Sequence, residues 1–463
     1  MRDFLPADVR RREYVIGVIK EVYERYGFEP LETPAVENIE TLMGKYGEEG
    51  NQLIFKILKR GVHESTGEAD LALRYDLTVP LARVVAEYRD KLPKFFKRYQ
   101  IQPVWRADRP ARGRFREFYQ CDVDVLGSRS MIVEAELIAA ASDVLTKLDF
   151  NDFTIRLNHR QLLTGILDVA GVPSEKHGDA LVALDKLDKI GEEGVLREFK
   201  EREVLIGGAG RKLIELFAGI GAGLIVDAYA KAERGGEDIL SVAESKAMNV
   251  AILDTLEEFI GSNKVGLNGL RELREIIQLV TANNLVSKTE ISPSLARGLS
   301  YYTGTIMEIS VKDLSGSLGG GGRYDNLVGM FLGQDVPACG FSLGMERIIV
   351  VMTEREMFPP ALVGSPADVM VTIWSDDSFG DSILLATELR REGLRVDLYP
   401  EADKLGKQFK YASERGIPFV TVIGADERAR GEVAIKDMRS GEQRSVKREL
   451  VAAALRKALE DHG

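Results

Sequence analysis

The chain has 463 residues, too many for one compact core, so its length predicts two to four domains. A hydrophobic content of 44 % and a charged content of 29 % are those of ordinary globular proteins. The formal charge of −11, from 62 Lys and Arg against 73 Asp and Glu, argues against binding of nucleic acid through bulk charge and leaves room for a local basic patch.

Cysteine usage and apolar patterning indicate the compartment. The two cysteines, Cys121 and Cys339, have no CxxC partner, which excludes a disulfide or zinc framework and favours a reducing compartment. The opening MRDFLPADVRRREY lacks the apolar stretch of a signal peptide, and no run approaches the roughly 18 apolar residues of a membrane span. The four histidines show no ligand spacing, so no metal site in the protein is predicted. We therefore expect a cytoplasmic protein with no membrane association.

The first expected elements are a helix and an extended segment. Apolar residues recur at a 3.6-residue period across residues 8–26, and Gly27 follows, which predicts a helix that ends there. The next stretch, FEPLETPAVE, has the pattern of an extended segment. Its Pro34 cannot donate a ladder hydrogen bond, so we expect this segment at a sheet edge or an interface.

Residues 71–87, LALRYDLTVPLARVVAE, predict a short strand followed by a helix. The helix is expected to begin near Pro80, because proline is favoured in the first turn. Asp76 and Thr78 lie at the junction between the two elements, a place where binding residues are often presented. Two roles stay open for Thr78, ligand binding and capping of the helix.

The most basic part of the chain follows at residues 94–124. Between Lys94 and Arg116 there are eight basic residues against one acid, Asp108, and Asp122 and Asp124 come next at alternate positions. A proline and a glycine separate two apolar runs, which predicts a strand, a loop and a second strand. Arginine grips phosphate or carboxylate through two parallel hydrogen bonds, so we expect an anion site, for a nucleotide in the first place. The alternative is a basic surface hairpin without a ligand.

The middle of the chain is predicted to be helical. Residues 131–149 have an amphipathic helical pattern, TIRLNHR is typical of a short strand, and residues 172–290 are nearly all helical with polar faces. We interpret this last segment as an insertion into a larger α/β domain. Its GIGAGL lacks the third glycine and the preceding strand of a dinucleotide-binding turn, so no such site is expected.

A second dense region spans residues 295–347. LARGLSYYTGTIMEI predicts a turn and then a strand, with Arg297, Tyr301 and Tyr302 beside the turn. The four glycines of SLGGGGRYDN would let the backbone approach a ligand closely, or would form only a tight hairpin. ACGFSLGMERIIVVM predicts a strand, a glycine and a helix, with Arg347 in the first turns of the helix.

From about residue 365 onward the pattern changes again. ADVMVTIW, LRVDLY and PFVTVIG have the composition of strands, and SILLATELRREG and KLGKQFKYASERG have helical periodicity. Two more short strands and a last helix complete the segment. The alternation predicts an independent α/β domain over residues 366–463, and roughly 100 residues is a normal domain size.

Taken together, these motifs resemble the class II aminoacyl-tRNA synthetases, and among them the histidyl-tRNA synthetase family. FEPLETPAVE resembles motif 1, with its interface proline at Pro34. Residues 94–124 resemble motif 2, with its arginine at Arg106, and GFSLGMERI resembles motif 3, with its arginine at Arg347. LRYDLT, REFYQCDVD and ARGLSYYTG are similar to segments specific to the histidine enzymes. The resemblance covers almost the whole chain.

The resemblance implies a fold, an assembly and a reaction. The fold class is α/β, with an α+β catalytic domain that contains the antiparallel class II sheet and helices at residues 1–171 and 291–360. A helical insertion at 172–290 and an α/β anticodon-binding domain at 366–463 complete the chain, and the protein is expected to be a homodimer. The implied reaction converts ATP and L-histidine to histidyl-adenylate and pyrophosphate, and then transfers histidine to the 3′ end of tRNA(His).

The resemblance also implies roles at the nucleotide. Arg106 would grip the α-phosphate and Arg347 the distal phosphates, which Mg²⁺ would shield, and Arg114 would complete the ATP site. Arg297 stands in the place of the family's catalytic arginine, between the histidine carboxylate and the α-phosphate. Arg106 and Arg297 are therefore the catalytic candidates. Positioning and charge neutralisation suffice for this reaction, without covalent help from the protein.

For the amino acid, the resemblance assigns one acid to the ammonium group and another to the ring. The implied histidine site consists of Asp76, Thr78, Arg106, Gln120, Asp124, Arg297, Tyr301 and Tyr302. Asp76, Thr78 and Gln120 would hold the α-ammonium, and Asp124 with one of the two tyrosines would bond the imidazole nitrogens. Ser300 departs from the family pattern RGLDYY, which has Asp at this position, so the charge beside the tyrosines is altered.

Two other functions are kept as alternatives. A synthetase-like regulatory subunit of histidine biosynthesis shares the catalytic fold, but such relatives lack the C-terminal domain and lose catalytic arginines. Here Arg106, Arg297 and Arg347 are all present. The other alternative is a class II synthetase for another amino acid. Asp124 and the double tyrosine argue against it, because most other substrates have no ring nitrogens to bond.

Overall fold

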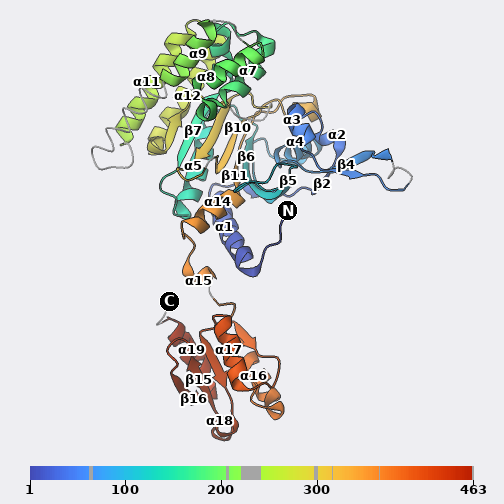
Figure 1. The fold of residues 1–463 in the computed structure, drawn as a ribbon, viewed down its shortest axis with the longest axis vertical. Helices are drawn as coiled ribbons and strands as arrows, with labels where there is room; N and C mark the ends of the chain where they lie inside the picture. Colours follow the sequence, from blue (N-terminus) through green and yellow to red (C-terminus); the bar gives the residue numbers. More distant parts are fainter. Residues whose placement is uncertain are drawn as a thin grey trace. The chain divides into compact units, whose positions relative to one another are not determined.

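A computed structural model shows the fold of the chain (Figure 1). The structure describes residues 1–61, 66–204, 208–219, 241–296, 301–314, 316–363 and 365–460. The chain divides into two compact units, Met1–Met357 and Phe358–Gly463, each with its own hydrophobic core. Within the described ranges, no helix combines the length and the apolar character that crossing a membrane requires.

A large mixed sheet forms the centre of the first unit. Its strand order among the described residues is β1-β5-β6-β11-β10-β9-β7-β8. These strands are β1 (Glu29–Pro30), β5 (Phe96–Trp105), β6 (Glu117–Leu126), β7 (Thr154–His159), β8 (Thr289–Ile291), β9 (Thr305–Ser310), β10 (Gly319–Arg323) and β11 (Ala338–Gly344). The inner pairs are antiparallel, and the outer pairs β1–β5 and β7–β8 are parallel. The antiparallel catalytic sheet expected from the resemblance is confirmed, with a parallel strand added at each edge.

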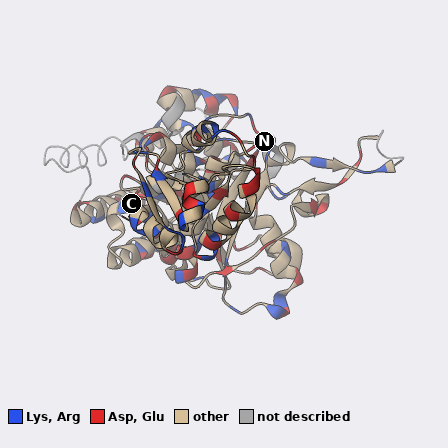
Figure 2. Ribbon diagram, turned by 90° about the horizontal axis from the view of Figure 1, so that it is seen from below, with Lys and Arg blue, Asp and Glu red and all other residues tan. Residues whose placement is uncertain are grey.

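The N-terminal elements follow the local sequence signals. Helix α1 (Pro6–Arg25) has a proline at its start and stops before Gly27, whose φ of 74° is the left-handed conformation that glycine tolerates best. The segment predicted to be extended is a strand only near its two ends, and Pro34 itself lies in no strand. Its first part, β1, is an edge strand of the large sheet, as predicted. A small second sheet has the order β2-β4-β3 and consists of β2 (Val36–Asn38), β3 (Lys56–Leu58) and β4 (Ala69–Leu73). Figure 2 shows its β3–β4 hairpin projecting from the unit.

The junction after β4 shows whether Thr78 caps the helix that follows. Helix α4 (Thr78–Glu87) begins at Thr78, two residues before Pro80, and its N-cap residue is Leu77. The capping role considered for Thr78 is therefore wrong. Asp76 serves the helix end instead, since its Oδ1 accepts the backbone N–H of Val79 at 3.1 Å. Thr78 is thereby left at the mouth of the site described below.

The glycine run forms a strand in the interior of the sheet. Strand β10 lies between β9 and β11, so the tight hairpin considered as one alternative is wrong. The neighbouring backbones come so close that an added Cβ at Gly321 would lie 2.1 Å from the carbonyl oxygen of Gly340. A Cβ at Gly319 would lie 2.6 Å from that of Ser342. Glycine is needed here because two strands approach each other, which is a packing requirement that composition does not reveal.

Helices cover the sheet and make up most of the segment for which an insertion is predicted. Helix α5 (Ile132–Lys147) lies on one face, where its Glu134 receives two hydrogen bonds from Arg323 of β10 at 2.7 and 2.8 Å. The next helices gather on one side of the unit in Figure 1. They are α6 (Arg160–Val169), α7 (His177–Leu184), α8 (Leu187–Glu201), α9 (Gly208–Gly219), α11 (Val242–Ile260) and α12 (Lys264–Ala282). The helical character predicted for this segment is confirmed where the structure describes it. All of GIGAGL except its first residue, Gly219, lies outside the described residues.

The second unit is an α/β sandwich, as predicted for the end of the chain. Its sheet has the order β13-β12-β14-β15-β16, with β12 (Val369–Val371), β13 (Val396–Leu398), β14 (Phe419–Val422), β15 (Glu432–Asp437) and β16 (Gln443–Lys447). Alternate residues of β12 face opposite layers. Val369 and Val371 pack with α16 (Phe379–Arg391) and α19 (Val451–Glu460), whereas Met370 packs with α17 (Leu405–Glu414). The short helix α18 (Ala425–Arg430) precedes β15.

Candidate active site

A cavity of about 450 Å³ lies over one face of the large sheet. Paired residues of neighbouring strands point to the same face, so they form rows across it. One row contains Gln102, Gln120 and Gly344. The next contains Gln100, Asp122, Ser342, Gly320 and Glu308. The third contains Arg98, Asp124, Gly340, Gly322 and Ile306. The glycines leave room over β10 and β11, and the cavity occupies part of that room.

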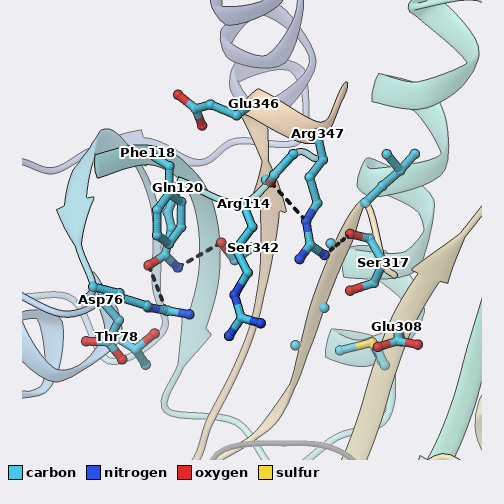
Figure 3. Close-up of a pocket in the computed structure, with 18 of the residues that line it drawn as sticks. Asp76, Thr78, Arg114, Phe118, Gln120, Glu308, Ser317, Ser342, Glu346 and Arg347 are labelled. Atoms are coloured by element: carbon cyan, nitrogen blue, oxygen red, sulfur yellow. Dashed lines mark hydrogen bonds between the residues drawn. The ribbon is translucent and has the colours of Figure 1, made fainter. Parts of the chain in front are cut away.

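Asp76 forms an acidic end of the cavity (Figure 3). The carboxylate is almost fully buried, and two hydroxyl groups donate to it, Tyr46 at 2.8 Å and Tyr301 at 3.3 Å. Burial raises the pKa of Asp76, and the bonds from Tyr46 and Val79 together with the charge of Arg106 oppose that rise. Thr78 lies beside Asp76 in Figure 3. This end offers oxygen acceptors of the kind that an ammonium group seeks.

Arg106 lies next to this acidic end. Its Nε donates to the carbonyl oxygen of Tyr75 at 3.1 Å and its Nη2 to Oε1 of Gln120 at 3.4 Å. The guanidinium group also stacks on two rings, 4.3 Å from the centre of Tyr75 and 5.1 Å from that of Phe118. Gln120 in turn donates to Oγ of Ser342 at 3.0 Å. Arg106 is thus held in place by aromatic and backbone contacts, and no carboxylate hydrogen-bonds to it among the described residues.

Two more arginines occupy the middle and the far end of the cavity. Figure 3 shows Arg114 between Gln120 and Arg347. Arg114 forms a paired interaction with Asp108, at 3.0 and 2.8 Å. Arg347, in the first turn of α14 (Met345–Glu354), donates to the backbone oxygens of Gly113 and Ser317 at 3.4 and 2.5 Å. The cavity therefore has a buried acid at one end and a series of arginines that leads from it to Arg347 at the other.

Most other arginines of residues 94–116 do not line the cavity and have other partners in the protein. Arg112 pairs with Glu354 and donates to the backbone oxygen of Asp313. Arg116 donates to the backbone oxygen of Asp108 at 3.1 Å, and Arg98 is fully buried below the cavity. The basic surface hairpin considered as an alternative does not describe this stretch, because its loop and two residues of β6, Phe118 and Gln120, line a cavity.

The remaining predicted site residues are only partly brought together. Tyr301 and Tyr302 line the cavity, and the ring of Tyr302 lies against Gly322, where an added Cβ would be 3.0 Å from it. Asp124 does not line the cavity as it stands. Its carboxylate is buried against Arg98 and receives a hydrogen bond from the hydroxyl of Tyr324. Arg297 and Ser300 lie outside the described residues, so their predicted roles stay predictions.

Several cavity residues carried no strong signal in the sequence. Ser342 and Glu308 line the cavity, and the sequence around each of them gave only a weak indication of a site. Ser342 alternates with glycines in ACGFSLG, and Glu308 is a lone acid in the apolar run TIMEIS. Glu346 also lines the cavity, where it accepts the backbone N–H of Tyr119 at 2.9 Å and pairs with Arg12 of α1 at 2.8 Å. That pair joins residues 334 positions apart, which no local pattern predicts.

Comparison with known proteins agrees with this geometry. Residues 1–348 match the family model described as Histidyl-tRNA synthetase. The chain belongs to the histidyl-tRNA synthetase family. It is therefore an aminoacyl-tRNA synthetase, a ligase, and the resemblance stated from its motifs is confirmed. Residues 368–458 match a second family model, described as an anticodon binding domain.

Relatives of the histidyl-tRNA synthetase family match along nearly their full length. Proteins from Porphyromonas gingivalis and Cytophaga hutchinsonii, both named histidine–tRNA ligase, are 41 % and 40 % identical to this chain. Each match covers 96 % of this chain and 95 % of the relative. The crystal structure of histidyl-tRNA synthetase from Nostoc sp. PCC 7120 has a TM-score of 0.76 at 31 % identity, over 99 % of this chain and 97 % of that one. The apo Staphylococcus aureus synthetase, at 17 % identity and a TM-score of 0.63, shares the fold over 98 % of both chains.

Proposed function

We propose that this chain is a histidine–tRNA ligase that uses the cavity for both steps of the reaction. The observation that carries the proposal is the order of charges along the cavity, in which the buried Asp76 lies at one end and Arg106, Arg114 and Arg347 follow toward the other. Glu308 and Glu346 also line the cavity on the Arg347 side. The ammonium group of L-histidine would bind at Asp76, Thr78 and Gln120. The phosphates of ATP would then lie along the arginines, so that both anions meet near Arg106.

The chemistry follows from that placement. The histidine carboxylate attacks the α-phosphorus, and negative charge develops on the α-phosphate oxygens while pyrophosphate leaves. Arg106 stabilises that charge, because its guanidinium group is fixed in position before the reaction starts. Arg297 would act with it between carboxylate and phosphate. Arg114 and Arg347 would bind the pyrophosphate end. A ribose hydroxyl at the 3′ end of tRNA(His) would then attack the histidyl carbonyl of the adenylate, and AMP would leave.

Magnesium is proposed as part of the ATP substrate. Mg²⁺ prefers oxygen ligands and keeps phosphate oxygens and waters in its shell. Glu308 lies on β9 toward the Arg347 end of the cavity in Figure 3, so its carboxylate fits that requirement. Its charge would also balance the arginines around the phosphates.

We further propose the division of the chain given by its motifs. The catalytic domain would comprise residues 1–171 and 291–360, the insertion residues 172–290, and the anticodon-binding domain residues 366–463. The second unit, whose α/β sheet matches an anticodon binding domain, would contact tRNA(His). The protein would act as a cytoplasmic homodimer, which sedimentation at several concentrations can test.

The alternative of a regulatory subunit of histidine biosynthesis is not favoured. The crystal structure of an ATP phosphoribosyltransferase regulatory subunit/histidyl-tRNA synthetase from Bacillus halodurans shares only the fold with this chain, at 20 % identity. Here Arg106, Arg114 and Arg347 line the cavity, and residues 368–458 of the C-terminal unit match an anticodon binding domain. Histidine-dependent exchange of pyrophosphate into ATP separates the two functions. Folded protein that gives no exchange with histidine would refute the ligase.

One prediction concerns the ammonium site. Asp76→Asn keeps an oxygen that can accept from Tyr46 and Val79 but removes the negative charge. We expect the KM for histidine to rise about 10- to 100-fold, because a hydrogen bond to a charged group is worth roughly 1.5–3 kcal/mol. The KM for ATP should change by less than about threefold. Asp70→Asn, an exposed acid on β4, is the control and should leave both values unchanged. Equal increases for histidine and ATP would contradict the assignment.

A further inference from the structure

A buried arginine lies directly below the cavity, and the reaction as described does not use it. The side chain of Arg98 on β5 is fully buried, and Arg98 pairs with Asp124 across β5 and β6. Its Nη2 lies 2.8 Å from Oδ2 of Asp124 and 3.8 Å from Oδ2 of Asp122. One guanidinium group thus lies between two buried carboxylates that occupy alternate positions on β6.

The packing of Arg98 is poor for a purely structural ion pair. Nη1 donates to Oε1 of Gln100 at 3.2 Å and Nη2 reaches the carbonyl oxygen of Leu77 only at 3.5 Å. The buried Nε makes no hydrogen bond to any described residue. Buried ion pairs seldom stabilise a fold more than apolar side chains of similar volume would, and an unsatisfied buried donor costs free energy. Stability therefore does not explain why a charged cluster occupies this place.

The charges of the cluster depend on Arg98. Burial raises the pKa of Asp124, and Arg98 opposes that rise. Burial and the charge of Asp124 also raise the pKa of Asp122, which lies at about 7 although Arg98 lowers it. Without the guanidinium group, two adjacent buried carboxylates would compete for a proton, because both cannot stay ionised side by side. A protonated carboxyl oxygen donates a hydrogen bond instead of accepting one. Asp124 would then lose its ability to accept the N–H of an imidazole ring on that oxygen.

Two neighbouring glycines bring Asp124 close to a tyrosine of the cavity. The carboxylate of Asp124 lies over Gly340, where an added Cβ would be 1.8 Å from its Oδ1. The next residue in the row is Gly322, and the ring of Tyr302, which lines the cavity, lies against it. Asp124 and Tyr302 therefore occupy neighbouring positions in one row, so a group bound beside Tyr302 would lie next to the carboxylate.

We propose that Arg98 is a positioning residue that keeps Asp124 a hydrogen-bond acceptor aimed at the imidazole of histidine. The inference rests on the proposed function and adds a determinant of its specificity. Arg98 touches neither substrate. It acts through Asp124 alone, with Asp122 as the competing carboxylate whose charge it balances.

The test uses pyrophosphate exchange with the full chain and separates the two substrates. Arg98→Met removes the charge and keeps most of the volume. We expect the KM for histidine to rise about 30-fold, the loss of one charge-assisted hydrogen bond, while the KM for ATP changes less than about threefold. Histidinol, which carries the ring and the ammonium group without the carboxylate, should lose affinity as a competitor by the same factor.

A second variant distinguishes positioning from packing. In Arg98→Met/Asp122→Asn the competing acid is gone, so Asp124 ionises more easily and the KM for histidine should fall at least about fivefold from the single variant. If Arg98→Met does not fold, Arg98→Lys keeps the charge without the planar fork, and a selective rise in the KM for histidine is still expected. Arg323→Met removes a buried arginine from the opposite face of the sheet and should lower stability without a selective change for histidine.

Two results would overturn the inference. One is a KM for histidine that is unchanged in both the methionine and the lysine variant. The other is a parallel rise for histidine and ATP that Asp122→Asn does not relieve. Neither can be confused with failure of the proposed function, which would appear as absence of histidine-dependent exchange in the unmodified protein.

Discussion

Replacement of Arg106 by alanine is expected to lower the rate of histidine-dependent pyrophosphate exchange about 100- to 1,000-fold. The guanidinium group is held by Tyr75, Phe118 and Gln120 before any substrate binds, so its removal takes away a donor aimed at the developing charge. Most of the loss should appear in kcat, because charge on the α-phosphate is greatest in the transition state. Steady-state exchange over a range of ATP and histidine concentrations measures both constants.

Arg112→Ala is the matched control for this prediction. Arg112 belongs to the same loop, but its side chain pairs with Glu354 of α14 and does not line the cavity. We expect exchange within about threefold of the unmodified protein, since exposed ion pairs contribute little to stability. Similar losses in the two arginine variants would mean that the loop needs bulk positive charge, and would remove the specific role given to Arg106.

Gly340→Ala is expected to have the second large effect, on histidine binding. The added methyl carbon would lie 1.8 Å from Oδ1 of Asp124, so this carboxylate must move. Arg98 and Tyr324 hold the carboxylate from other directions, which leaves it little room. We expect the KM for histidine to rise about 30- to 100-fold as the hydrogen bond to the ring is lost. Overpacking of this kind should also cost roughly 1–3 kcal/mol of stability, measurable as a lower unfolding temperature.

The same change at another position separates crowding from a general effect of alanine. Gly17 lies in α1, and a Cβ there meets nothing within 4 Å. Gly17→Ala should leave exchange unchanged and stabilise the helix slightly, because alanine has the higher helix propensity. If Gly340→Ala binds histidine normally, Asp124 is not needed at its present position and its proposed role in ring recognition is wrong.

Local elements were predictable because their signals are local. The strand–loop–strand at residues 94–124 follows from two apolar runs around a proline and a glycine, and it became β5, the loop and β6. The start of α4 was placed two residues late, because Pro80 is tolerated anywhere in the first turn. Two alternatives were open for the glycine run, a ligand-facing wall and a hairpin; it forms an interior strand, three glycines of which line the cavity. The closeness of β9 and β11 requires the glycines, and no neighbour in sequence could indicate that.

The same distinction, between local sequence signals and contacts distant in sequence, applies to the predicted site residues. Motifs were enough to select Arg106 and Arg347, which do line one cavity. They could not show which arginines of the basic stretch are already neutralised. Arg112 is paired with a glutamate 242 residues away, and Arg98 lies buried against Asp122 and Asp124 of the neighbouring strand. Partners of this kind depend on strand pairing and helix packing.

By itself, the amino-acid sequence determined the helices and strands, the α/β character of both parts of the chain and the family to which it belongs. Short-range periodicity and the order of several motifs carry that information, and neither depends on the path of the chain between them. The tertiary structure alone decided which charges meet. In the folded chain, two tyrosine hydroxyls donate to Asp76, and the carboxylate of Asp124 lies over a glycine of β11. Arg98 lies within 4 Å of two carboxylates, at 2.8 and 3.8 Å. Electrostatic interactions act through space over a few ångströms, so their strength is fixed only once distant segments are folded together.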